Sequence, residues 1–168
     1  MVSPPPPGWH KINFDAAVRP NNVYLAAICR NHMGRITYAW VNVDSHGGSL
    51  WAEAKAVLFA VSCAFVVGLD SIIFERDALQ VINSLQNSAS SPHWSISNII
   101  NDINVFTLSF SCISFSHVLR SANVLAHSLV ALAPFCNCLG AIPISSLPTF
   151  VIQADLVDGI GPMTPSFD

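Results

Sequence analysis

The sequence predicts an α/β fold in which a mixed sheet of five strands is flanked by helices. Three β-type runs follow one another closely near the N-terminus, and the order continues as α, β, α, α, β, α. The composition supports this, because 52% apolar and only 10% charged residues in a chain of 168 provide one sizeable core and exclude disorder of the whole chain. We therefore expect one domain with short tails.

Three strands open the predicted domain. In residues 11–18 polar and apolar side chains nearly alternate, and the polar face of this strand carries Asp15. Residues 23–29 form a second β-type run, and the turn residues 31–34 lead into a third at 35–43. Strands joined this closely predict an antiparallel meander.

Helices and strands alternate after the meander. Residues 50–67 contain no helix breaker between Ser49, a possible N-cap, and Gly68, and they predict the first long helix. The later elements are a strand at 71–74, helical stretches at 79–85 and 95–106, a strand at 112–119 and a last helix at about 122–133. The later strands follow crossover segments, and we expect them to extend the sheet in parallel.

The two ends of the chain differ from its middle. Residues 1–8 form a proline-rich lead-in, and residues 134–168 show no clear period and are expected to form a poorly ordered tail, which places the domain at 9–133. No signal-peptide pattern is visible, and the apolar run at 56–69 is shorter than the roughly 20 residues of a membrane span. The five cysteines lack the spacing of a disulfide framework. We expect an intracellular protein, neither secreted nor transmembrane, in the nucleus or the cytoplasm.

Acidic residues at unusual positions indicate a candidate site. Asp15 lies in a strand, Glu53 on an otherwise apolar helix and Asp77 at the end of a strand. A carboxylate on a buried face is costly unless it is paired or binds a metal. If the three acids converge, a divalent cation offsets their repulsion, and oxygen ligands favour Mg²⁺ or Mn²⁺ in phosphodiester hydrolysis. The alternative is that each acid is a surface or capping residue, with Asp77 capping a helix that begins at Ala78.

Five segments of the chain carry a family pattern. They are WHKINFDAA, AAICRNHMGRITYAW, LWAEAKAVLFAV, SIIFERDALQVINSL and FSHVLRSANVLAHSLV, in this order. Together they resemble the ribonuclease H type 1 domain of the plant retroelement, reverse transcriptase-associated branch. The resemblance implies the ribonuclease H-like fold and hydrolysis of the RNA strand of RNA–DNA hybrids.

The same resemblance implies a cofactor and partners. The cofactor is Mg²⁺ at a two-ion site, with Mn²⁺ as a substitute, and the partner is nucleic acid in the form of an RNA–DNA hybrid. No membrane and no small-molecule cofactor is expected. The chain would be a monomer or a fragment of a larger retroelement-derived protein.

Individual residues receive roles from the resemblance. Asp15, Glu53 and Asp77 correspond to the catalytic, metal-binding acids. His127 stands where the family usually has a fourth catalytic acid, and a neutral imidazole is a poorer ligand than a carboxylate for Mg²⁺. This departure puts the metal site in question.

Four further residues are implied to bind the substrate. The backbone at Ala16 and Ala17 would line the groove for the hybrid. Arg120 and Asn123 match a family Arg and Asn that contact a phosphate or brace the last helix.

Two other functions remain open from the sequence. His127, the small number of basic residues and the tail without a clear period favour a domesticated or decayed retroelement domain that binds nucleic acid or a protein partner with little or no cleavage. The aromatic and apolar segment at 150–152 could instead serve as a docking strand in a protein-interaction module.

Overall fold

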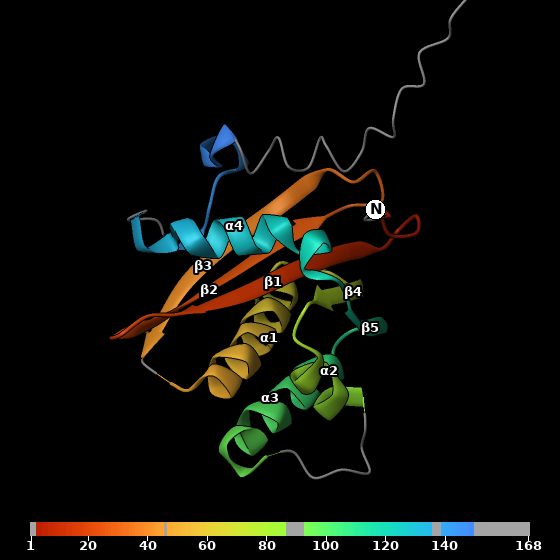
Figure 1. Ribbon diagram of the computed structural model, residues 1–168. Helices are drawn as coiled ribbons and strands as arrows, with labels where there is room; N and C mark the ends of the chain where they lie inside the picture. Colours follow the sequence, from red (N-terminus) through yellow and green to blue (C-terminus); the bar gives the residue numbers. More distant parts are fainter. Residues whose placement is uncertain (1–2, 46, 87–92, 136–138, 150–168) are drawn as a thin grey trace, which may run out of the picture.

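The computed structural model describes residues 3–45, 47–86, 93–135 and 139–149. Its centre is a six-stranded mixed sheet in the order β5-β4-β1-β2-β3-β6, with helices on both faces (Figure 1). In chain order the elements are β1 (His10–Val18), β2 (Asn22–Arg30), β3 (Ile36–Ser45), α1 (Ser49–Val66), β4 (Ser71–Arg76), α2 (Leu79–Gln86), α3 (Ser97–Thr107), β5 (Cys112–His117), α4 (Val124–Leu132) and β6 (Gly140–Ala141). The predicted α/β class and element order are confirmed.

The sheet joins an antiparallel meander to two parallel strands. β2 pairs antiparallel with both β1 and β3, whereas β4 is parallel to β1 and β5 is parallel to β4. Alternation along β1 places Ile12 and Phe14 on one face and Asn13 and Asp15 on the other. The predicted meander with parallel additions is confirmed.

The two faces of the sheet carry separate cores. α1 and α3 cover the face that holds Phe14 and Phe74, and α4 covers the opposite face with Leu125 and Leu129 (Figure 1). Among the described residues α1 is the one helix long and apolar enough to cross a membrane by length and composition alone. Its alanine-rich side is buried against the sheet, which is the environment of a core helix.

Two element boundaries differ from the predicted ones. The N-cap of α1 is Gly48, which makes no side-chain capping bond, so the expected capping role of Ser49 is wrong. The last helix begins at Val124 because a 3₁₀ turn at Arg120–Ala122 precedes it. The end of α1 is as expected, since Gly68 follows it with a φ of 72° that favours glycine.

Residues near both ends pack on the domain. Pro5 is buried, and the Lys11 Nζ donates to the Ser3 carbonyl over 2.6 Å. β6 pairs with β3, and Ile142 and Leu147 join the core under α4.

These contacts correct the expected strand count. The sheet has six strands rather than five, and residues 139–149 contribute to the sheet and to the core. Poor order of the tail at 134–168 stays a prediction. Pairing of β6 with Trp40 and Val41 covers this part of the edge of β3, which would otherwise present unpaired backbone groups. The boundaries at 9 and 133 stay a prediction, and the expected docking strand lies outside the described residues.

Candidate active site

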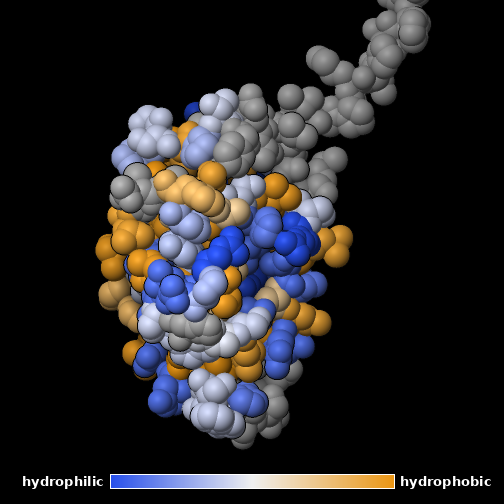
Figure 2. Space-filling model, turned by 60° about the vertical axis from the view of Figure 1, so that its left-hand side comes forward, coloured by the Kyte–Doolittle hydropathy of each residue, from blue (hydrophilic) through white to orange (hydrophobic). Residues whose placement is uncertain are grey.

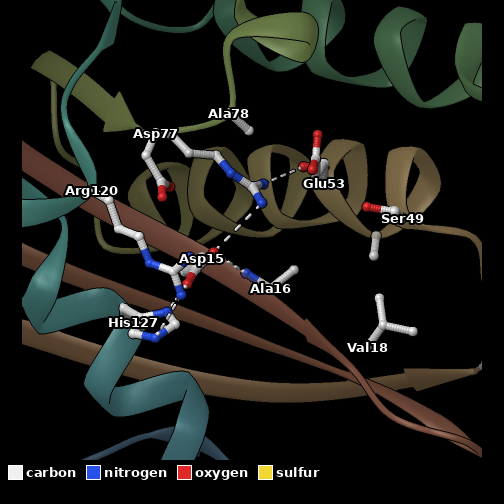
Figure 3. Close-up of a pocket in the computed structure, with 11 residues that line it drawn as sticks. Asp15, Ala16, Val18, Ser49, Glu53, Asp77, Ala78, Arg120 and His127 are labelled. Atoms are coloured by element: carbon white, nitrogen blue, oxygen red, sulfur yellow. Dashed lines mark hydrogen bonds and ion pairs between the residues drawn. The ribbon is translucent and has the colours of Figure 1, made fainter.

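A cavity of about 250 Å³ opens beside β1, the end of β4 and the first turns of α1 and α4 (Figure 3). Its walls are formed by Asp15, Ala16, Val18, Ser49, Ala52, Glu53, Arg76, Asp77, Ala78, Arg120 and His127. Hydrophilic residues also gather around a hollow on the face of the molecule that Figure 2 shows. In a chain with so few charges, this concentration of acids and bases marks the cavity as the candidate site.

Asp15 makes hydrogen bonds and ion pairs through both of its carboxylate oxygens. It lies on β1 with only 8% of its surface exposed. Its Oδ1 accepts a hydrogen bond from the Ala16 amide at 2.8 Å and lies 3.6 Å from an Arg76 Nη2. Its Oδ2 lies 3.0 Å from the His127 Nδ1. Both carboxylate oxygens therefore have partners within the protein.

Arg76 places a buried cation among the acids. It is the last residue of β4 and is 3% exposed. Its Nη1 donates to the Glu53 carbonyl over 2.8 Å, and its guanidinium carbon lies 5.6 Å from the centre of the Phe14 ring. Burial lowers the pKa of the guanidinium, while the charges of Asp15, Glu53 and Asp77 raise it.

Asp77 is held by a buried amide. It follows β4 directly, is half-buried, and its Oδ1 accepts a hydrogen bond from the Asn123 Nδ2 over 3.1 Å. The same Nδ2 donates to the Phe14 carbonyl over 3.1 Å. Asn123 is fully buried and is not among the residues of the cavity wall. Its expected contact with the substrate stays a prediction. Bracing of α4 against β1 and Asp77, the alternative left by the sequence, is what its contacts provide.

His127 and Arg120 form a chain of contacts that ends on Asp15. The Arg120 Nη2 lies 3.2 Å from the His127 Nε2, and Figure 3 shows both side chains on the side of the cavity opposite Glu53. A guanidinium only donates and a carboxylate only accepts, so these partners assign a neutral ring with its proton on Nδ1. The imidazole thus directs an N–H, and not a lone pair, at Asp15.

The three acids are the type of ligand that a divalent cation prefers, but their side chains do not surround a common point. Asp15, Glu53 and Asp77 all line the cavity, and carboxylate oxygens are the ligands that Mg²⁺ and Mn²⁺ prefer. Within the described parts of the chain, however, no three His, Cys, Asp or Glu side chains lie close enough together to hold a metal ion. The positive charge beside Asp15 is instead Arg76.

The remaining expected residues divide between the cavity and the core. Ala16 and Arg120 line the cavity, whereas Ala17 packs beside the core under α4 and is absent from the cavity wall. Contact of Ala17 with the hybrid stays a prediction. Arg76 was not among the expected site residues. The only sequence signal for it was its position directly before Asp77, and its burial depends on acids that lie far away in the chain.

Comparison with known proteins now places the chain in a family. The profile of a family described as reverse transcriptase-like matches residues 13–133. The chain belongs to the reverse transcriptase-like family. The matched region contains every residue that lines the cavity. No match was found among proteins of curated function.

Solved ribonucleases H share the fold of this family member. Ribonuclease H1 of Halobacterium salinarum superposes with a TM-score of 0.70 at 21% identity, covering 76% of this chain and 98% of the other. LC11-RNase H1, solved in complex with an RNA/DNA hybrid, gives 0.67 at 16% identity, covering 74% and 95%.

A viral protease-reverse transcriptase shares the fold over part of its length. Prototype foamy virus protease-reverse transcriptase gives a TM-score of 0.59 at 14% identity, covering 77% of this chain and 21% of the viral one. At such identities the likenesses establish the ribonuclease H fold, while the chemistry has to come from the cavity itself.

Proposed function

We propose that this reverse transcriptase-like domain hydrolyses the RNA strand of RNA–DNA hybrids in the presence of Mg²⁺ or Mn²⁺. The observation that carries the proposal is the convergence of Asp15, Glu53 and Asp77, from three different elements, on one cavity. LC11-RNase H1, which shares the fold, was solved with an RNA/DNA hybrid, and this supports the substrate class. The branch and the intracellular placement expected from the sequence are part of the same proposal.

The acids supply the site for the cation. Asp15, Glu53 and Asp77 would hold it, because a hard divalent ion prefers carboxylate oxygens. A metal bound there supplies an activated water and stabilises the leaving oxygen of the phosphodiester.

Other residues of the cavity suit a sugar–phosphate backbone. Arg120 is exposed at the cavity wall, where its guanidinium can pair with a phosphate. The small side chains of Ala16, Ala52 and Ala78 leave the wall open to close approach by a ribose. Asn123 and His127 act on the acids, since the first holds Asp77 and the second holds Asp15.

Cleavage of a labelled RNA–DNA hybrid in Mg²⁺, and separately in Mn²⁺, tests the proposal. We expect cut RNA with the wild type and a loss of at least about a hundredfold in rate for Asp15→Asn, Glu53→Gln and Asp77→Asn. Asp102→Asn is the matched control, because Asp102 is exposed on α3, outside this cavity, and its removal should leave the rate unchanged. Intact RNA in both metals with folded wild-type protein would contradict hydrolysis.

A second candidate is hybrid binding without cleavage. The observation that favours it is the engagement of both Asp15 oxygens by protein groups. His127→Asp separates the candidates, since it replaces the imidazole by an acid. Cleavage that rises in His127→Asp supports an attenuated hydrolase, whereas binding of the hybrid with no cleavage by either protein supports a binding domain.

A further inference from the structure

The buried guanidinium of Arg76 stands where the proposed function requires a different cation. It contacts Asp15 on β1 and the Glu53 carbonyl on α1, and it immediately precedes Asp77 in the chain. It thereby reaches all the elements that supply the acids. With 3% of its surface exposed, it is part of the floor of the cavity and not a surface arginine that swings in solvent.

The two contacts of Arg76 differ in strength. The bond from Nη1 to the Glu53 carbonyl is 2.8 Å long, within the range of a good hydrogen bond. The Nη2 lies 3.6 Å from the Asp15 Oδ1, which is an ion pair without a hydrogen bond. The contact with Asp15 is therefore the weaker of the two, and the contact with α1 is the stronger.

The charge of Arg76 acts against a second cation. Without it, the carboxylates around the cavity would repel one another, because the repulsion of like charges is strong where water is partly excluded. With it, a divalent ion at Asp15 would meet the positive charge of Arg76 at short range.

We propose that Arg76 is a built-in counter-ion of the acid cavity, and that Mg²⁺ or Mn²⁺ binds only when the guanidinium moves away from Asp15. The inference rests on the proposed function, since it concerns the cation of that reaction. In this scheme the charge of Arg76 sets the affinity of the cavity for the divalent cation. Arg76 is a positioning residue in this scheme, because it acts on Asp15 and not on the substrate.

The test measures metal binding without substrate. Isothermal titration with Mg²⁺ and Mn²⁺ compares the wild type with Arg76→Gln, which keeps a donor for the Glu53 carbonyl but removes the charge. We expect the Kd to fall at least about tenfold in Arg76→Gln and to stay near the wild-type value in Arg76→Lys, which keeps the charge. Arg30→Gln is the matched control, because Arg30 is also buried but lies outside the cavity wall.

Thermal unfolding supplies an independent readout. In EDTA, Arg76→Gln should melt at a lower temperature than the wild type, because its acids lack a counter-ion. Saturating Mg²⁺ should then raise the Tm of Arg76→Gln by more than it raises the Tm of the wild type. If Arg76 contributes only packing, Arg76→Gln will melt at a lower temperature and its Tm will respond to metal no more than that of the wild type. If Arg76→Gln does not fold in EDTA, refolding in Mg²⁺ replaces the comparison, and failure to refold there overturns the proposal.

Failure of this inference is distinguishable from failure of the proposed function. An unchanged Kd in folded Arg76→Gln overturns the role of Arg76, even if the wild type cleaves hybrids. A lower Kd without cleavage by either protein leaves the counter-ion established and contradicts hydrolysis instead.

Discussion

Two polar clusters lie along the same face of β1 and have opposite characters. In the first, which we call the closed network, the Lys11 Nζ lies 2.8 Å from the Glu75 Oε1, and the Asn13 Nδ2 donates to the Glu75 Oε2 over 3.3 Å. Arg30 completes it with a 2.7 Å bond to the Asn13 Oδ1. The second cluster is the acid cavity, two residues further along β1, at Asp15.

The two clusters differ in burial and in access to open space. All four side chains of the closed network are buried and are bonded within the network. In the acid cavity Glu53 and Asp77 are only half-buried and a volume of about 250 Å³ remains. Buried charge on a sheet therefore identifies a site only where it adjoins open space.

The largest expected effect on stability comes from opening the closed network. Glu75→Gln leaves the Lys11 ammonium buried without its counter-ion, and we expect the free energy of unfolding to fall by about 3–5 kcal/mol in urea titrations. Glu53→Gln, at the open cavity, should change it by less than about 1 kcal/mol because the site is solvated. If Glu75→Gln and Glu53→Gln lose the same free energy of unfolding, the two clusters do not differ in the way described.

A smaller effect on the free energy of unfolding is expected at Asn123, the buried amide beneath the acid cavity. Asn123→Ala removes the donor to the Phe14 carbonyl and to Asp77, and we expect a loss of about 1–3 kcal/mol in urea unfolding. Asn101→Ala, at an exposed position of α3, should stay within about 0.5 kcal/mol of the wild type and serves as the control. If Asn123→Ala is as stable as the wild type in urea, the amide does not brace α4.

The smallest effect concerns an ion pair outside both clusters, between Asp44 on β3 and Lys55 on α1 at 2.8 Å. Burial raises the pKa of Asp44, but the bonds from Lys55 and Ser45 outweigh it and leave the pKa below the ordinary value of 3.8. A carboxyl with a lowered pKa in the folded state contributes stability above pH 3.8, and this contribution disappears as the pH falls through the lower, folded-state value.

For this partly exposed pair we expect at most about 1 kcal/mol, because water screens it. Urea unfolding between pH 5 and pH 2 (about the titration range of Asp) should show the difference between the wild type and Lys55→Met shrinking toward the acid end. A difference that grows on acidification would contradict the assigned sign.

The sequence by itself determined the element order, the antiparallel meander with parallel additions, and the elements that carry Asp15, Glu53 and Asp77. These features follow from periodicity, because a period of two or of 3.6 residues shows which side chains share a face. The position of Gly68 likewise determined the end of α1.

Only the tertiary structure decided how the acids are paired. The contact of His127 with Asp15 spans 112 residues, and the bond from Asn123 to the Phe14 carbonyl spans 109. The burial of Arg76 and the addition of β6 to the sheet have the same origin. Local patterns carry no information on such distances, because a buried charge is stable only where segments remote in sequence bring the opposite charge within a few ångströms.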